Sequence, residues 1–187
     1  PAKPLGCYGD GGAVLTNNDD YAALVKSLRV HGKGTDKYDN VRIGMNSRLD
    51  TLQAAVLLEK LALFPAELTR RQHVAGLYSA ELVHSPLLVT PKCDIGVSSS
   101  WAQYTLQAQS ISRSTLQKRL QNQNIPTAVY YATCMHQQLA FTSATPAFTD
   151  LSIAESLASC SFSIPMHPYL ADEEVERIIS VLLNMSL

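Results

Sequence analysis

The stretch PAKPLGCYGDGGAVLT, residues 1–16, places a lysine before a glycine-rich turn and a short apolar segment. Its glycines, at positions 6, 9, 11 and 12, allow positive φ and close backbone approach. Pro4 stiffens the chain that leads into the turn, and residues 13–16 predict a short buried strand after it. A lysine near the first residue of a chain is most often a solvated charge, so a chemical role for Lys3 requires agreement from motifs further along.

The composition is that of an ordinary globular protein. The chain has 187 residues, of which 46% are hydrophobic and 17% charged, with a net charge of -1. No apolar run approaches the roughly 18 residues that span a bilayer, and no signal peptide is recognisable. The four cysteines lack C-x-x-C spacing and the five histidines are dispersed, so we expect a cytoplasmic protein without a metal site or disulfides.

Hydrophobic periodicity predicts alternating helices and strands, and so an α/β fold class. Pro65 is expected to end one helix near Phe64 and to mark a domain joint between residues 1–64 and 65–187. The helix after it, to about Val83, should carry a solvated charged face that includes Arg70 and Arg71. The other expected helices cover about 21–31 (capped by Asp19 or Asp20), 49–64, a segment around 116–120, 151–158 and 172–183, and the later strands 103–108, 126–131 and 162–165.

Further motifs follow in order: RIGMNSRLDTLQAA (42–55), WAQY (101–104), IPTAVYY (125–131, followed by His136 and Gln138) and SIPMHP (163–168). From the residues alone, Asn46 or Asp50 could simply cap the following helix, and Arg48 could be a surface residue. Tyr130 and Tyr131 would alternate on a strand, so one of them should pack into the core.

Together with the lysine and its glycine turn, these motifs resemble the DegT/DnrJ/StrS-type sugar aminotransferases, which use pyridoxal phosphate. The resemblance covers essentially the whole chain and implies an aspartate-aminotransferase-like fold (fold type I), of which this chain would be the later half. Residues 1–64 would be the C-terminal part of the large cofactor-binding domain, and residues 65–187 the small C-terminal α/β domain. The family works as a homodimer with its sites at the subunit interface.

The resemblance also implies roles for five residues. Lys3 would be the catalytic lysine that holds pyridoxal 5'-phosphate as a Schiff base, and Asn46 would reach the cofactor phosphate of the neighbouring subunit. Arg48, Tyr130 and Tyr131 would face a nucleotide-sugar substrate. The implied reaction moves an amino group from an amino acid, expected to be glutamate, to a keto-sugar in surface polysaccharide or O-antigen biosynthesis; the sugar, the nucleotide and the aminated carbon stay open.

Two other interpretations remain beside this one. The groups that the family supplies before its lysine, including a carboxylate for the pyridine nitrogen and a ring-stacking aromatic, are not found in this sequence. The chain by itself could therefore be a catalytically inactive domain that serves only dimerisation or binding. A third interpretation, a nucleic-acid site, rests on six basic residues between positions 26 and 48, although such a run is more often a solvated face.

Overall fold

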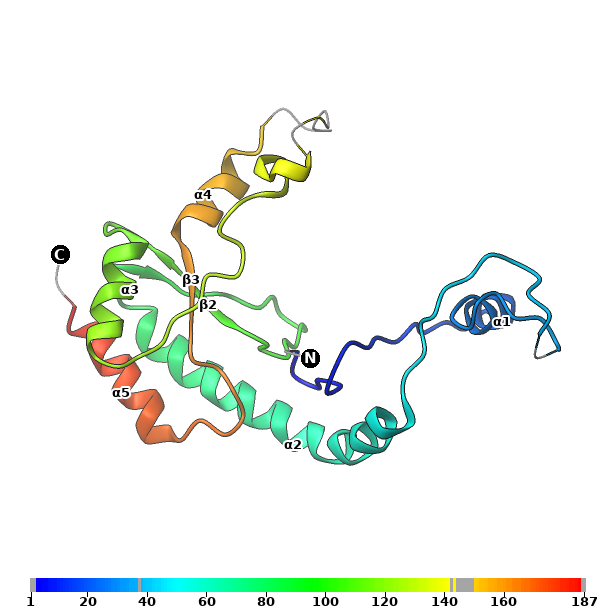
Figure 1. Ribbon diagram of the computed structural model, residues 1–187. Coiled ribbons are helices and arrows are strands. Elements are labelled where there is room, and N and C mark those ends of the chain that lie inside the picture. Colours follow the sequence, from blue (N-terminus) through cyan, green and yellow to red (C-terminus); the bar gives the residue numbers. More distant parts are fainter. Residues whose placement is uncertain (1–2, 37, 142, 144–149, 186–187) are drawn as a thin grey trace. The chain divides into compact units, whose positions relative to one another are not determined.

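Helix α2, Thr51–Leu82, is the longest element and runs through the boundary between two compact units, residues 1–64 and 65–187. The computed structural model describes residues 3–36, 38–141, 143 and 150–185 (Figure 1). The other elements are α1 (Asp19–Leu28), β1 (Leu88–Val89), β2 (Tyr104–Ala108), α3 (Arg113–Asn122), the 3-10 turns η1 (Met135–Gln137) and η2 (Leu139–Phe141), α4 (Ser152–Cys160), β3 (Ser161–Ile164) and α5 (Asp172–Leu183).

Helix α1 begins two residues earlier than the sequence predicts and ends three residues sooner. Its N-cap is Asn18, whose Oδ1 accepts a hydrogen bond from the backbone N–H of Tyr21 at 3.0 Å. The helix stops at Leu28 because the chain turns away there: His31 has a φ of 59° and its backbone N–H donates to the carbonyl of Met45 at 3.0 Å. The segment after α1 is thus held against residues 45–47 rather than continuing as helix.

The predicted buried strand at residues 13–16 is wrong. These residues are not in a strand, and Val14 and Leu15 are 71% and 92% exposed. A strand needs a partner for its backbone groups, and no strand of the described chain pairs with this segment. Among the described residues of unit 1, only Ser27 and Gly32 are buried, so this unit holds no apolar core of its own.

The predicted helix break at Pro65 is also wrong, because α2 continues through it. A proline inside a helix removes one backbone hydrogen bond and costs about 3 kcal/mol. That cost is offset further along α2, where Val74, Tyr78 and Leu82 are fully buried. Each such side chain contributes roughly 1.5–3 kcal/mol, so the packed half of the helix stabilises the whole of it.

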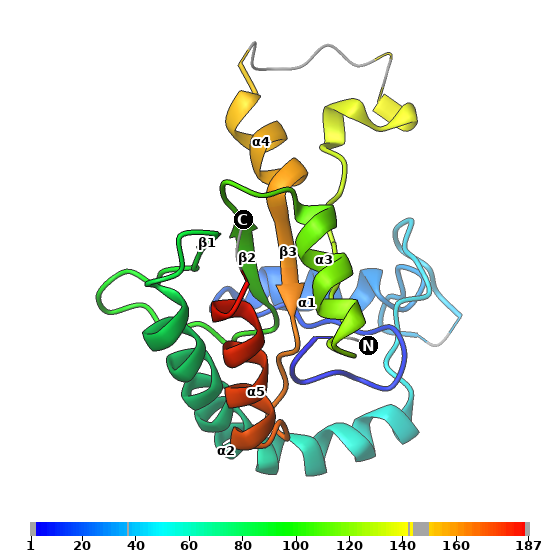
Figure 2. The ribbon, with the colours of Figure 1, turned by 90° about the vertical axis from the view of Figure 1, so that its left-hand side faces the viewer.

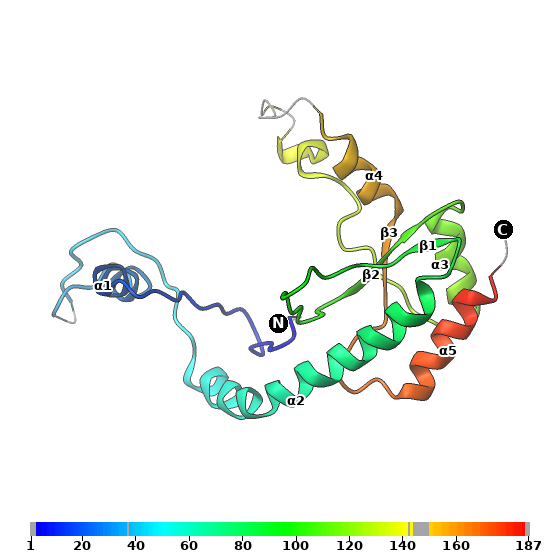
Figure 3. The same ribbon diagram turned by 180° about the vertical axis from the view of Figure 1, so that it is seen from behind.

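Unit 2 is built on a three-stranded antiparallel sheet of order β1-β2-β3. Tyr104 pairs with Ile164 and Leu106 with Phe162, and these four buried side chains share one face of the sheet. Helices α2, α3 and α5 cover that face (Figures 2 and 3). The strands expected at 103–108 and 162–165 and the final helix are confirmed to within about two residues.

The charged face of α2 is not solvated as predicted. Arg71 is only 8% exposed, and its Nη1 donates to the carbonyl oxygens of Trp101 at 2.9 Å and Met166 at 3.4 Å. Burial lowers the pKa of this guanidinium. Arg70 pairs with Asp172 at 2.5 Å, joining α2 to the first turn of α5. Both arginines therefore hold unit 2 together.

Candidate functional site

The lysine and its turn lie in unit 1, and the described residues give Lys3 an exposed side chain with no hydrogen-bond or ion-pair partner. The turn behind it is tight, because Gly6, Tyr8 and Gly9 have φ values of 57°, 53° and 143°. Within it the thiol of Cys7 donates to the carbonyl of Gly9 at 2.7 Å. The sequence thus places an unengaged amine just before an ordered turn.

Gln53, in the first turn of α2, is a site residue that the sequence analysis missed. Its Nε2 donates to the carbonyl oxygens of Cys7 at 2.9 Å and Asp10 at 3.3 Å, which are both in the glycine turn. The spacing Asp50-x-x-Gln53 is that of a capping box and could have predicted the side-chain contact with the helix start. The hydrogen bonds to Cys7 and Asp10 span 46 and 43 positions of the chain, so no local sequence pattern could have predicted them.

Asn46 and Arg48 lie side by side in unit 1. Arg48 Nε donates to Asn46 Oδ1 at 2.9 Å, and both side chains are exposed. The backbone of Asn46 forms an isolated antiparallel bridge with Val30, which fixes its place beside α1. With its oxygen engaged by Arg48, the carboxamide of Asn46 keeps its two N–H donors for an anion.

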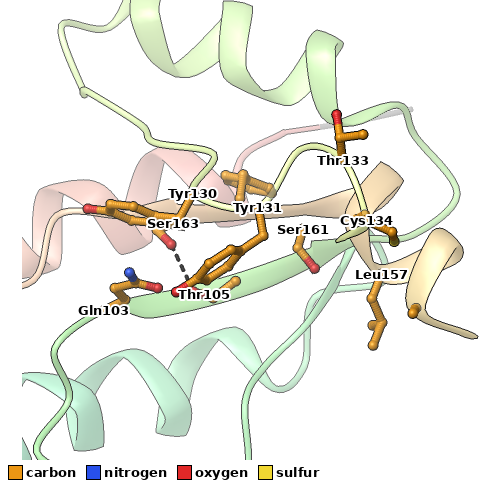
Figure 4. Close-up of a pocket in the computed structure, with 12 residues that line it drawn as sticks. Gln103, Thr105, Tyr130, Tyr131, Thr133, Cys134, Leu157, Ser161 and Ser163 are labelled. Atoms are coloured by element: carbon orange, nitrogen blue, oxygen red, sulfur yellow. Dashed lines mark hydrogen bonds between the residues drawn. The ribbon is translucent and has the colours of Figure 1, made fainter. Parts of the chain in front are cut away.

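Tyr130 and Tyr131 lie in unit 2 and line a hollow of about 220 Å³ (Figure 4). The hollow is on the polar face of the sheet, opposite the core, where Thr105 and Ser163 bond to each other at 2.8 Å. Residues of α4 close another side, among them Leu157. A volume below the roughly 300–1,000 Å³ of drug-sized ligand sites suits part of a larger ligand.

The expectation that one of these tyrosines packs into the core is wrong: they are 58% and 74% exposed. Residues 126–131 do not form the predicted strand, and their only pairing in the described chain is the bridge between Ala128 and Ser163. Without strand geometry the side chains need not alternate between two faces. Both tyrosines are thereby available to a ligand.

A second, more open hollow of about 740 Å³ adjoins the first and shares both tyrosines with it. His136 lines this second hollow and is held to α4, since its Nε2 lies 2.8 Å from Glu155 Oε1. His136 therefore joins the chain around η1 to α4.

Other kinds of site find less support in the described part of the chain. No group of three or more histidine, cysteine, aspartate or glutamate residues there is placed to hold a metal ion. None of its helices is long and apolar enough to cross a membrane. In the basic run, Arg42 is engaged internally, since its Nη1 donates to Ser27 Oγ at 2.6 Å.

Comparisons with known proteins find aminotransferases that resemble this chain in sequence and in structure. A solved DegT DnrJ EryC1 StrS aminotransferase from Brucella abortus is 46% identical, with a TM-score of 0.91 over 97% of this chain and 48% of that one. The structure of DesV from S. venezuelae is 33% identical, with a TM-score of 0.90 over 96% of this chain and 48% of that one. A UDP-2-acetamido-2-deoxy-3-oxo-D-glucuronate aminotransferase from Pseudomonas aeruginosa is 39% identical over 98% of this chain and 49% of its own length.

These matches define an α/β protein with the fold type I architecture of the pyridoxal-phosphate-dependent sugar aminotransferases. The model of the DegT/DnrJ/EryC1/StrS aminotransferase family matches residues 1–183, and the chain belongs to that family. The chain spans about half the length of the curated relatives it matches.

Proposed function

We propose that this chain is the later half of an aminotransferase that moves an amino group from an amino acid, expected to be glutamate, to a keto carbon of a nucleotide-linked sugar. Such a reaction would serve surface polysaccharide biosynthesis in the cytoplasm. The observation that carries the proposal is the exposed amine of Lys3 before an ordered glycine turn, in a chain 39% identical to a nucleotide-sugar aminotransferase.

The residues of unit 1 suit pyridoxal phosphate, whose ring supplies an electron sink when it is bound. Lys3 offers a primary amine without a competing partner, and such an amine attacks an aldehyde in its neutral form. The amide N–H groups of Asn46, oriented by Arg48, are donors of the kind that hold a phosphate in a neighbouring subunit. Lys3 would hold the cofactor and, once freed, carry a proton to and from the reacting carbon.

The substrate would be held by Arg48, Tyr130 and Tyr131. A guanidinium is suited to the diphosphate or a sugar carboxylate, and the exposed tyrosine rings and hydroxyls can pack against and hydrogen bond a sugar or base. The hollow of about 220 Å³ at the tyrosines would take one such group. Residues 1–64 would complete the cofactor domain and residues 65–187 would form the small domain of a homodimer.

The experiment is the intact mass of the chain after incubation with pyridoxal phosphate and borohydride, with Lys3→Ala alongside. Lys26→Ala is the matched control, because Lys26 is another exposed lysine of unit 1. One adduct that is lost only in Lys3→Ala supports the proposal. No adduct, or one spread over surface lysines, contradicts it for this polypeptide.

A second candidate is a catalytically inactive domain that acts only in dimerisation or binding. It is favoured by the exposure of unit 1, where many large apolar side chains, among them Leu52 and Ile43, face outward. Surfaces of that kind mark contacts with another chain. Turnover with any amino donor and keto-sugar would exclude this candidate.

A further inference from the structure

The glycine turn that follows Lys3 is fitted around one side chain of α2. A Cβ added at Gly9 would lie 2.9 Å from Gln53 Nε2, and one added at Gly11 would lie 2.6 Å from Cys7 Sγ. Real Cβ atoms essentially never come so close, and the φ of 143° at Gly9 is strained for any other residue. Glycine at these positions lets the backbone close onto Gln53 and Cys7.

The carboxamide of Gln53 has three partners, and together they admit a single orientation. Its Nε2 donates to the carbonyl oxygens of Cys7 and Asp10, at 2.9 and 3.3 Å. Its Oε1 accepts from the backbone N–H of Asp50, the residue before α2, at 3.4 Å. An amide carries both donors and an acceptor, so the one side chain of Gln53 can join the start of α2 to both ends of the four-residue turn 7–10.

Glutamine is suited to this position in a way that glutamate is not. A glutamate would keep the acceptor for the Asp50 N–H, but it would have no donor for the two carbonyl oxygens. Its negative charge would also face both of them. A second contact, between Lys60 Nζ and the ring of Tyr8 at 5.4 Å to the centroid, joins the same turn to α2. The turn is therefore held from one helix, chiefly through Gln53.

We propose that Gln53 is the positioning residue of the cofactor lysine: by holding residues 7–10 on α2 it fixes the backbone from which Lys3 extends. This inference rests on the proposed function, in which Lys3 holds pyridoxal phosphate. Lys3 lies four residues before Cys7 and its side chain has no partner of its own among the described residues. The order of the turn therefore limits the positions that the Lys3 amine can reach.

The experiment compares the wild-type chain with Gln53→Glu and the uncharged, similarly long Gln53→Met. Gln121→Glu, at an exposed glutamine of α3, is the charge-matched control. Alkylation of Cys7, measured by mass spectrometry relative to the exposed Cys93 in the same molecule, reports on the turn without any cofactor. Borohydride capture of pyridoxal phosphate at Lys3 reports on the lysine, and the alkylation rate of Cys134 shows that unit 2 stays folded.

Both Gln53 variants lose the two hydrogen bonds to the turn, and this loss should speed Cys7 alkylation about tenfold. Capture of pyridoxal phosphate at Lys3 should slow by a similar factor, while the Cys134 rate and the Gln121→Glu control stay unchanged. An unchanged Cys7 rate overturns the inference. So does a freed turn with undiminished capture at Lys3. A wild-type chain without a Lys3 adduct refutes the proposed function, and the positioning role is then overturned with it, whatever Cys7 shows.

Discussion

Raising the pH above 10 is expected to destabilise unit 2 through two tyrosines, Tyr78 and Tyr104. Both are fully buried, and their rings lie 5.0 Å apart. The hydroxyl of Tyr78 donates to the carbonyl of Pro165 at 3.0 Å, and that of Tyr104 bonds Ser79 Oγ at 2.8 Å. Burial raises the pKa of both phenols, and for Tyr78 the neighbouring Tyr104 and Glu174 raise it further.

The sign follows from proton binding. In the unfolded chain a tyrosine ionises near pH 10, whereas in the folded chain these two keep their protons to higher pH. The folded state then binds more protons than the unfolded state, so the free energy of unfolding falls as pH rises from 10 toward the folded pKa values. Each tyrosine contributes about 1.4 kcal/mol per pH unit, and the pair about 2.7.

The variant Tyr78→Phe isolates one of the two protons. At pH 8 it should cost about 1–3 kcal/mol, because the carbonyl of Pro165 loses its donor. Above pH 10 that cost should shrink by about 1.4 kcal/mol per pH unit, because the variant no longer loses the Tyr78 proton on unfolding.

The measurement is urea unfolding from pH 8 to 11.5, followed by the fluorescence of Trp101, the single tryptophan. Its ring centroid lies 5.5 Å from that of Tyr104, so it reports on unit 2. Tyr21→Phe, at an exposed tyrosine of unit 1, is the control. If wild type and Tyr78→Phe lose stability in parallel above pH 10, the reasoning about Tyr78 is refuted.

Four further outcomes are expected. The hydrogen bond from Arg70 lowers the pKa of Asp172 in the folded chain. The stability that the Asp172 carboxylate contributes is therefore present above pH 4 and is lost as the pH falls through the folded pKa. Asp172→Asn should remove that part of the acid dependence, and an acid unfolding curve unchanged by this variant would contradict the prediction. Pro65→Ala restores a helix hydrogen bond inside α2 and should raise the free energy of unfolding by about 1–3 kcal/mol, seen as a higher urea midpoint. Phe162→Ala empties part of the core and should lower it by about 3–5 kcal/mol; a smaller loss would mean that the core collapses around the site. The isolated chain should self-associate through its exposed apolar side chains, and Leu52→Lys should reduce this; a monomer by light scattering in both would contradict it.

In unit 2 the sequence predicted helices α3, α4 and α5 and strands β2 and β3 to within a few residues. Helix α5 shows why: acidic residues fill its first turn, and Val175, Ile178 and Leu182 recur at helical spacing on its buried face. The prediction of a helix break at Pro65 was wrong because the packing of the later half of α2 outweighs the local preference of proline to end a helix. The prediction of a strand at residues 126–131 was wrong because an apolar run of that length fits a strand or a loop equally well.

The candidate site was predictable only as far as its residues are neighbours in sequence. Asn46 and Arg48 are two positions apart, and the structure joins them by a hydrogen bond. The contact of Gln53 with the turn at Cys7 depends on a fold that returns 46 residues later, which no local pattern encodes. The burial of Arg71 could not be predicted for the same reason. Its charge indicated an exposed side chain, and its hydrogen-bond partner, the carbonyl of Trp101, is distant in sequence.

The two halves of α2 show what an apolar pattern does and does not say. Leu52 and Leu58 are 83% and 69% exposed, while Val74 and Tyr78 on the same helix are fully buried. Periodicity indicates that a side chain is suited to burial, but not which part of which chain covers it. Because the curated relatives are about twice as long as this chain, we expect the cover for the first half of α2 to come from the remaining length of such a protein. On this argument, adding the remaining length of the protein as a separate polypeptide should both suppress self-association through unit 1 and raise the capture of pyridoxal phosphate at Lys3. If the chain is an inactive dimerisation module, self-association should fall without any rise in capture.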